Sequence, residues 1–250
     1  MAPVSDSKNI GHFPLAISHS ESQSPSMKTD QAAEQLQTIR TLMERSALYR
    51  RALAPLMTYA GVLGILAAFL GYLLRVEAET TFIVYWYAVA LLGLSGSLFL
   101  VRRQAIKTNE PFWSPPTRRV AAAMLPTLTV GFVIGVWVYF ALSSSPPGES
   151  SGGQYQDGEN LGWLAAVWAI LYGCGLHAAG FFTSRGLRRF GWLFIAAGNA
   201  IICWMLWNQH DRTPSHVWWH SHVLMGALFG GLQLAYGIYL YATGEEQNEL

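Results

Sequence analysis

Four histidines near the end of the chain have a spacing that can bind a metal ion. They lie in the stretch His210–His222. On a helix, His216 and His220 are four residues apart and can hold one ion from the same face, with His210 or Asp211 as a third ligand. The other interpretation is a belt of imidazoles and indoles at a membrane surface. Because no H-E-x-x-H motif is present, we favour the belt and keep the metal site as the alternative.

A second group of polar residues lies deep inside apolar runs. His177 comes sixteen residues after Leu161, and Gln233 comes sixteen after Val217. Each is therefore about 24 Å along its helix at 1.5 Å per residue. At equal depth the two side chains can form an interhelical hydrogen bond worth about 1 kcal/mol or less. Such residues, with Asn199 as a third, are candidate functional residues, although we favour a structural role.

The same residues disfavour several kinds of chemistry. His222 lies only five residues after Val217, so it is about 16 Å from the depth of His177, too far for both to ligate one haem iron. No Asp, Glu, Lys or Arg stands at the centre of an apolar run, as an ion-coupled transporter usually requires. No Ser–His–Asp or Cys–His arrangement is present. We therefore expect no enzyme and, apart from the metal alternative, no cofactor.

The elements that position these residues are predicted to be membrane helices. Of the 250 residues, 52% are hydrophobic and 12% are charged, about half the usual charged fraction. Six apolar runs each approach the roughly 20 residues that cross a bilayer, at 53–74, 81–101, 120–142, 161–182, 190–207 and 217–241. The sequence predicts an all-α, multi-pass fold, with a six-helix transmembrane bundle over residues 53–243 and lipid around it.

Stripes of small residues predict how these helices pack. Steps of three and four residues return to one helix face, and several runs carry glycines at those steps. Such stripes let helix backbones approach closely in a membrane. They can pack within one chain or between two copies, so a homo-oligomer stays open. The stripes are Gly61, Gly64, Ala68 and Gly71 in the first run, Gly131 and Gly135 in the third, and His222, Gly226, Gly230, Gln233 and Gly237 in the last.

The loop charges predict the orientation of the bundle. Basic residues gather before the first run, between the second and third, and between the fourth and fifth, whereas the alternate connections are acidic or mixed. Basic loops stay in the cytoplasm. We expect both termini to be cytoplasmic. The basic residues concerned are Arg40, Arg45, Arg50 and Arg51, then Arg102, Arg103, Lys107, Arg118 and Arg119, then Arg185, Arg188 and Arg189.

The segments outside the bundle are polar. Residues 1–29 lack an apolar signal-peptide core and are predicted to be a disordered tail, and Met27 is an alternative start to Met1. Residues 30–52 are predicted to form an amphipathic helix, either lying on the membrane surface, which we favour, or docking a cytoplasmic partner over residues 30–51. Residues 244–250 form a short cytoplasmic tail. No nucleic-acid-binding motif is present.

Three stretches carry a resemblance to known proteins. They are I-R-T-L-M-E-R-S at 39–46, F-W-S-P-P-T-R-R at 112–119 and M-G-A-L-F-G-G-L-Q-L-A-Y-G at 225–237. Together they resemble a group of uncharacterised six-span bacterial membrane proteins, over residues 33–241. The resemblance implies a bacterial inner membrane and a single bundle, but no activity. Such proteins often carry a histidine where this chain has Gln233, so the glutamine counts against a metal or haem there.

Two hypotheses for function follow from these features. We favour a non-enzymatic accessory, sensory or scaffold component, with the 30–51 helix as its partner surface and His177 and Gln233 in its core. The alternative is a small-solute or metal-handling transporter that uses the external histidine cluster and the interface between the fourth and sixth runs.

Overall fold

The computed structural model describes residues 53–76, 78–108, 115–144, 161–207 and 218–245. The chain divides into two compact units, Met1–Met43 and Glu44–Leu250, and every described residue belongs to the second. The predicted tail at 1–29 and amphipathic helix at 30–52 lie outside the described residues, as does most of the 244–250 tail.

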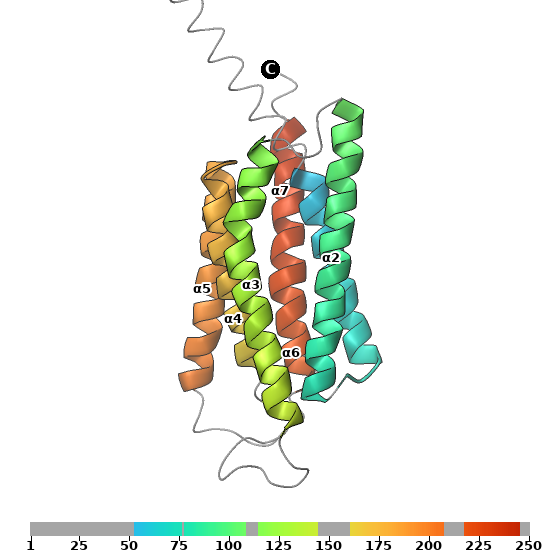
Figure 1. The fold of residues 1–250 in the computed structure, drawn as a ribbon, viewed down its shortest axis with the longest axis vertical. Helices are drawn as coiled ribbons and strands as arrows, with labels where there is room; N and C mark the ends of the chain where they lie inside the picture. The colour runs from blue at the N-terminus through green and yellow to red at the C-terminus, as the bar shows by residue number, and fades with distance from the viewer. Residues whose placement is uncertain (1–52, 77, 109–114, 145–160, 208–217, 246–250) are drawn as a thin grey trace, which may run out of the picture. The chain divides into compact units, whose positions relative to one another are not determined.

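Six helices in this unit are long and apolar enough to cross a membrane (Figure 1). The first span is Leu53–Leu73. It is followed by α2 (Glu79–Thr108), α3 (Pro115–Ser143), α4 (Leu161–Gly180) and α5 (Arg185–Trp207). The sixth span consists of α6 (Trp218–Met225), the π-helical segment η2 (Gly226–Leu232) and α7 (Gln233–Glu245). The predicted all-α, six-helix transmembrane bundle is confirmed.

Three helices extend beyond the apolar runs that predicted them. The second run ends at residue 101 but α2 continues to Thr108, and α3 and α5 each begin five residues before their runs, at Pro115 and Arg185. Hydropathy marks the part of a helix that suits lipid, whereas backbone hydrogen bonding continues through the polar residues beyond it. The basic residues at 102–119 and 185–189 therefore lie on these helix ends, whereas those before the first span lie outside the described residues.

The fourth and sixth spans form the interior of the bundle. They bury a larger share of their residues than the other four, and α2 and α3 bury the least. α4 packs closely along α5 and α3, while the sixth span lies against the first span and α4. The exposed face of α2 and α3 is lined with leucine, valine and phenylalanine, which suits contact with lipid acyl chains.

Glycines of the first and sixth spans bring their backbones into contact. A Cβ built on Gly64 would lie 2.8 Å from the Cα of Gly230, and one on Gly226 would lie 2.6 Å from the Cβ of Ala68. A Cβ on Gly237 would likewise lie 2.8 Å from the backbone nitrogen of Thr58. No side chain fits at such distances. We call this contact the glycine seam, and it joins the stripe of the first span to that of the sixth.

The sequence predicts a continuous α-helix for the sixth span, but the structure interrupts it. Its middle, Gly226–Leu232, is π-helical, and the backbone N–H of Gln233 donates to the carbonyl of Gly230 where α7 begins. π-Helical turns are rare and often occur at functional sites. Three of the seven residues of the segment are glycines, and the segment meets the first span along the glycine seam.

Aromatic side chains link neighbouring helices through their polar atoms. The Tyr59 hydroxyl donates to the Leu92 carbonyl at 3.0 Å, and that of Tyr87 donates to Phe132 at 2.6 Å. Trp168 Nε1 donates to the Gly131 carbonyl at 2.9 Å. In lipid no water is available to satisfy such groups. Each tyrosine or tryptophan donor therefore bonds a backbone carbonyl of a neighbouring helix, which accepts this bond in addition to the one within its own helix. These bonds join neighbouring spans.

Candidate functional site

His222 is enclosed by aromatic side chains at the end of the bundle where the first span meets α2. Its side chain is 1% exposed. The imidazole packs edge-on against Phe82 with 5.0 Å between ring centroids, and it lies 5.9 Å from Tyr85 and 6.1 Å from Trp86. Gly71 leaves room for the ring, because a Cβ there would lie 2.5 Å from His222 Nδ1. We call these residues the His222 cluster.

A tight turn after the first span supplies the hydrogen-bond partner of His222. The N–H of Val76 bonds the Gly71 carbonyl and that of Arg75 bonds the Tyr72 carbonyl, while Arg75 has φ 49°. This is a Schellman turn with a left-handed residue other than glycine. The Val76 carbonyl lies 3.2 Å from His222 Nε2. Since a carbonyl only accepts, Nε2 carries the proton, and His222 ties the turn to the sixth span.

Gln233 links the sixth span to the fourth. Its side chain is 4% exposed, and its Nε2 donates to the Tyr172 hydroxyl at 3.0 Å. Tyr172 is held by edge-on contacts with Phe194 and Phe229, at centroid distances of 5.1 and 5.5 Å. Among the described residues, no hydrogen-bond partner reaches Gln233 Oε1. The amide is therefore half satisfied within an aromatic surround.

The predicted hydrogen bond between His177 and Gln233 is wrong. Gln233 bonds Tyr172, which lies five residues before His177, or about 7.5 Å along the helix. The prediction assumed that the fourth and sixth spans begin at the same depth, and they do not. Tyr172 had been overlooked because a tyrosine in an apolar run looks like any other aromatic membrane residue.

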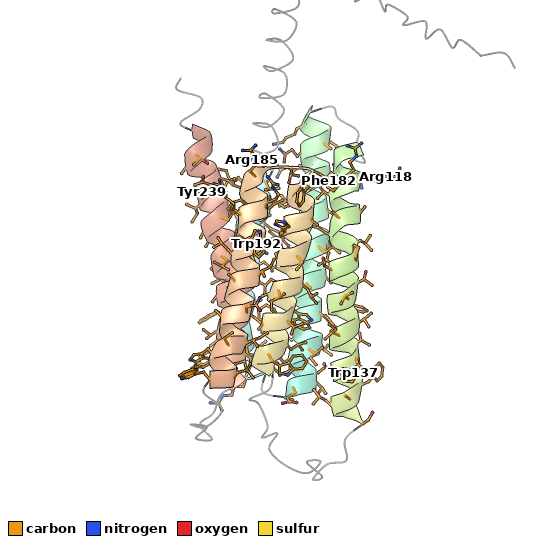
Figure 2. All side chains as sticks on the ribbon, turned by 90° about the vertical axis from the view of Figure 1, so that its left-hand side faces the viewer. Arg118, Trp137, Phe182, Arg185, Trp192 and Tyr239 are labelled. Carbon is orange, nitrogen blue, oxygen red and sulfur yellow. The ribbon has the colours of Figure 1, made fainter. Side chains whose placement is uncertain are left out.

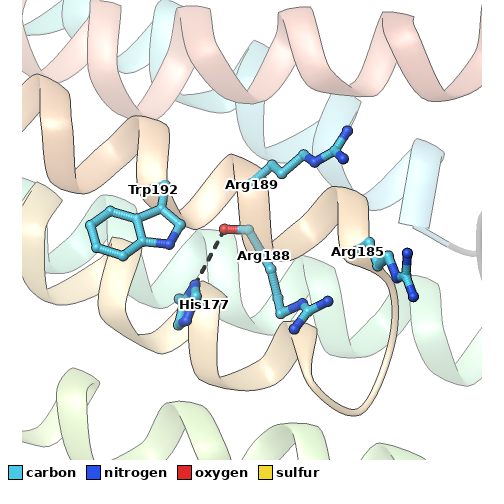
Figure 3. A pocket seen from close by; sticks show the side chains of 5 residues that line it. All are labelled: His177, Arg185, Arg188, Arg189 and Trp192. Carbon is cyan, nitrogen blue, oxygen red and sulfur yellow. Dashed lines mark hydrogen bonds between the residues drawn. The ribbon is translucent and has the colours of Figure 1, made fainter.

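His177 instead belongs to a basic cavity between α4 and α5. The cavity is lined by His177, Arg185, Arg188, Arg189 and Trp192 and has a volume of about 330 Å³ (Figure 3). It lies at the α4–α5 turn, whereas His222 contacts the turn after the first span. In a bundle that alternates direction these turns lie at opposite ends. The expectation that His177 and His222 cannot share one haem agrees with this separation.

Asn199 is not a buried polar residue, contrary to the sequence-based expectation. Its side chain is exposed and its Nδ2 donates to the Ile195 carbonyl of the same helix at 2.8 Å. A short amide can bond its own helix four residues back, which removes the need for a partner helix. A single polar residue in an apolar run does not indicate which face of the helix is buried, so the sequence could not predict the exposure of Asn199.

The predicted metal ligands cannot be placed. His210 and His216 lie outside the described residues, and so does the side chain of His220, although its backbone lies in the first turn of α6. Within the ranges that the structure describes, no three His, Cys, Asp or Glu side chains lie together. The metal alternative therefore stays a prediction.

The paired glycines of the third span contact α2 and α4. Gly131 and Gly135 are both buried. A Cβ on Gly135 would lie 2.8 Å from Trp168 Cζ2, while one on Gly131 would meet Trp168 at an ordinary 3.6 Å. Gly135 is thus the position that requires a glycine.

Taken chemically, the described side chains form two packed polar contacts and one open basic cavity. The sequence pattern marks the arginines of the cavity only as topology signals, although Arg185, Arg188 and Arg189 follow His177 closely in the sequence. A second cavity, of about 180 Å³, is lined by α2 and α3 side chains including Tyr87 and Phe132.

No protein-family model, curated protein or solved structure matches this chain.

Proposed function

We propose that this multi-pass membrane protein is a non-enzymatic accessory, sensory or scaffold component. The observation that carries the proposal is that two buried polar side chains of the sixth span, His222 and Gln233, make contacts with other parts of the bundle and do not line a cavity. His222 contacts the turn at Val76, and Gln233 contacts Tyr172. A substrate site in a transporter normally lies near the middle of the membrane, between helices with unwound backbone.

The glycine seam supports a scaffold. Contacts between the backbones at Gly64 and Gly230 leave no room for a ligand between the first and sixth spans. The π-helical segment lies in the same seam. It is the feature that a sensory role would use, since a π-helical turn can change its register within a helix that stays membrane-embedded.

We infer a bacterial inner membrane from the sequence resemblance, and the charge distribution supports an orientation with both termini in the cytoplasm. Figure 2 shows Arg118 and Arg185 at one end of the bundle and Trp137 at the other. The exposed Arg102, Arg103 and Lys107 continue α2 beyond its apolar part. Arginine and lysine are enriched on the cytoplasmic side, so this end is proposed to face the cytoplasm.

A partner-capture experiment tests the scaffold proposal. The predicted helix at 30–51 lies outside the described residues, so the substitutions follow its sequence pattern. We expect Leu36→Glu and Met43→Glu, on the apolar stripe, to abolish co-purification of a defined cytoplasmic partner identified by cross-linking. Thr38→Glu, on the other side of the same helix, is the matched control and should retain it.

A metal assay tests the alternative, a metal-handling transporter. The purified full-length chain is analysed for zinc, copper and haem iron. Stoichiometric metal that is lost in a His216→Ala, His220→Ala variant would overturn the scaffold proposal in favour of metal handling. Loss of the partner in the Thr38→Glu control would show that the 30–51 surface is not specific.

A further inference from the structure

The basic cavity between α4 and α5 has an unusual excess of positive charge. Three of its five lining residues are arginines, and a fourth is His177. Two glutamates lie in the described ranges: Glu79 begins α2 at the opposite end of the bundle, and Glu245 ends α7. Neither is among the residues that line the cavity. Three arginines on the first turns of one helix concentrate positive charge there, and an anion bound in the cavity offsets it.

Close packing of α4 on α5 builds the cavity. A Cβ on Gly180 would lie 2.7 Å from the backbone nitrogen of Arg188, and one on Gly191 would lie 2.6 Å from that of His177. The two helices therefore touch below the turn that joins them. Ser184 Oγ accepts the N–H of Leu187 at 3.2 Å, which caps the start of α5. This places the positive end of the α5 dipole at the cavity.

Two of the lining side chains are held in position. His177 Nδ1 lies 3.4 Å from the Arg188 carbonyl, and the His177 ring packs edge-on against Trp192 at 5.5 Å between centroids. The Arg188 guanidinium carbon lies 4.9 Å above the Phe181 ring. Figure 3 shows Arg188 beside His177, with Arg185 and Arg189 extending from the first turns of α5. Arg188 is thus a pre-oriented donor group, and the other two arginines are free to adapt.

The surroundings of the cavity favour a lipid as the source of the anion. Trp192 is 59% exposed and Phe181 is 64% exposed. Figure 2 shows Trp192 further into the bundle than Arg185, with Phe182 near the same end. Aromatic residues at this level mark the membrane interface. A ligand in the cavity therefore has headgroup-level donors above it and an apolar helix surface, including exposed Leu193, below it.

We propose that this cavity binds the phosphodiester headgroup of an anionic phospholipid. Arg188 donates to two oxygens of the phosphate, in the bidentate geometry that guanidinium favours. Arg185 and Arg189 add charge from the first turns of α5, and Trp192 contacts the glycerol region. The acyl chains lie along the exposed surface of α5. Basic pockets between membrane helices are suited to such headgroups, and the volume falls within the range of ligand sites.

Native mass spectrometry of the full-length protein in detergent tests the proposal. The protein is mixed with phosphatidylglycerol or phosphatidylcholine and the retained lipid is counted. We expect retained phosphatidylglycerol to exceed phosphatidylcholine. A charge-assisted hydrogen bond contributes about tenfold to binding. A variant with Arg185→Gln, Arg188→Gln and Arg189→Gln loses the two bonds of Arg188 and should bind on the order of 100-fold more weakly.

A matched variant separates a built site from general charge. Arg102→Gln, Arg103→Gln and Lys107→Gln remove the same charge from the same end of the bundle, outside the cavity. This control should bind phosphatidylglycerol within about twofold of the wild type, because isolated lipid molecules in detergent create no surface potential. An equal loss in both triple variants would overturn the proposal. Arg188→Lys keeps the charge but not the fork, so it should still weaken binding, and unchanged binding would contradict the assigned contact.

Two further measurements identify the source of the anion. Inorganic phosphate at 10-fold excess over lipid should leave the bound phosphatidylglycerol in place, and its displacement would instead indicate a soluble phosphate ligand. Deleting residues 245–250, which include three glutamates, should leave lipid binding unchanged. If lipid bound only after that deletion, the acidic tail would be the occupant and the lipid proposal would be wrong.

Discussion

Gln233 of the sixth span and Tyr172 of the fourth are joined by a hydrogen bond of 3.0 Å, with the amide as donor and the hydroxyl as acceptor. The oxygen of the same side-chain amide, Gln233 Oε1, has no hydrogen-bond donor among the described residues. The contact therefore joins two helices while leaving a buried polar atom unsatisfied, and the two substitutions that break it should differ.

Tyr172→Phe should destabilise the protein more than Gln233→Met. The first leaves both ends of a buried amide without a partner, which costs about 1–3 kcal/mol. The second removes the whole amide, including its unsatisfied oxygen, and leaves only the Tyr172 hydroxyl without its donor, so it should lower the free energy of unfolding by about 1 kcal/mol. Unfolding in mixed micelles measures both, and the double variant should show a coupling of about 0.6–1.7 kcal/mol. Zero coupling would mean that the bond contributes nothing.

Gly64→Ala should destabilise the protein by about 1–3 kcal/mol, as an overpacked core does. The added methyl would lie 2.8 Å from the Cα and nitrogen of Gly230, and backbone atoms cannot move aside. Gly93→Ala is the matched control, because its methyl would meet only Leu63 at 3.6 Å and alanine favours helix. Thermal unfolding in detergent checks both. Equal stability of the two variants would contradict the glycine seam.

His222→Ala should cost about 3 kcal/mol, as the loss of a buried aromatic ring does. It should also release the turn at Val76, which hydrogen exchange of its amides would detect as lost protection. Asn199→Ala, at an exposed site, should stay within about 0.5 kcal/mol of the wild type. Unchanged exchange at the turn in His222→Ala would show that the imidazole does not hold it.

Arg75→Gly should stabilise the protein by about 1 kcal/mol. Arg75 has φ 49°, a left-handed conformation that costs an L-residue about 1–2 kcal/mol and glycine almost nothing. Arg75→Ala tests the reason, because alanine keeps the strain and should bring no gain. A rise in melting temperature confined to the glycine variant is the expected result, and equal rises would point to the charge instead.

Cysteine labelling in cells tests the orientation. In a background with Cys174→Ser and Cys203→Ser, an impermeant maleimide should label Ser144→Cys from outside and should not label Lys107→Cys until the cells are opened. Both positions adjoin helix ends that the structure describes. Labelling of both residues from the same side would overturn the alternating topology.

Much of the fold could be predicted because lipid imposes simple rules on a sequence. An apolar run of the right length becomes a span, and glycines at helical spacing become contacts, as Gly64 and Gly230 did. His222 and Gln233 were expected on the buried stripe, and both are buried. These outcomes depend only on composition and period.

The partners of the polar residues could not be predicted, because they depend on the relative depth of the helices. A shift of five residues decided between His177 and Tyr172 as the partner of Gln233. Nothing in the residue pattern announces a π-helical segment, and the basic cavity depends on how closely Gly180 lets α5 approach. Local rules do not contain such offsets, which follow from packing of the whole bundle.

The helices of this bundle differ in length by half. α2 has 30 residues and α4 has 20, which correspond to about 45 and 30 Å. The extra length of α2 carries Arg102, Arg103 and Lys107. Because these side chains cannot enter hydrocarbon, this end of α2 must project beyond the acyl region. The basic cavity, by contrast, sits at the end of the short α4. In a thicker bilayer the cavity would lie within the acyl region, whereas α2 would still be long enough to span it. The shortest span therefore sets the hydrophobic mismatch that the protein can tolerate.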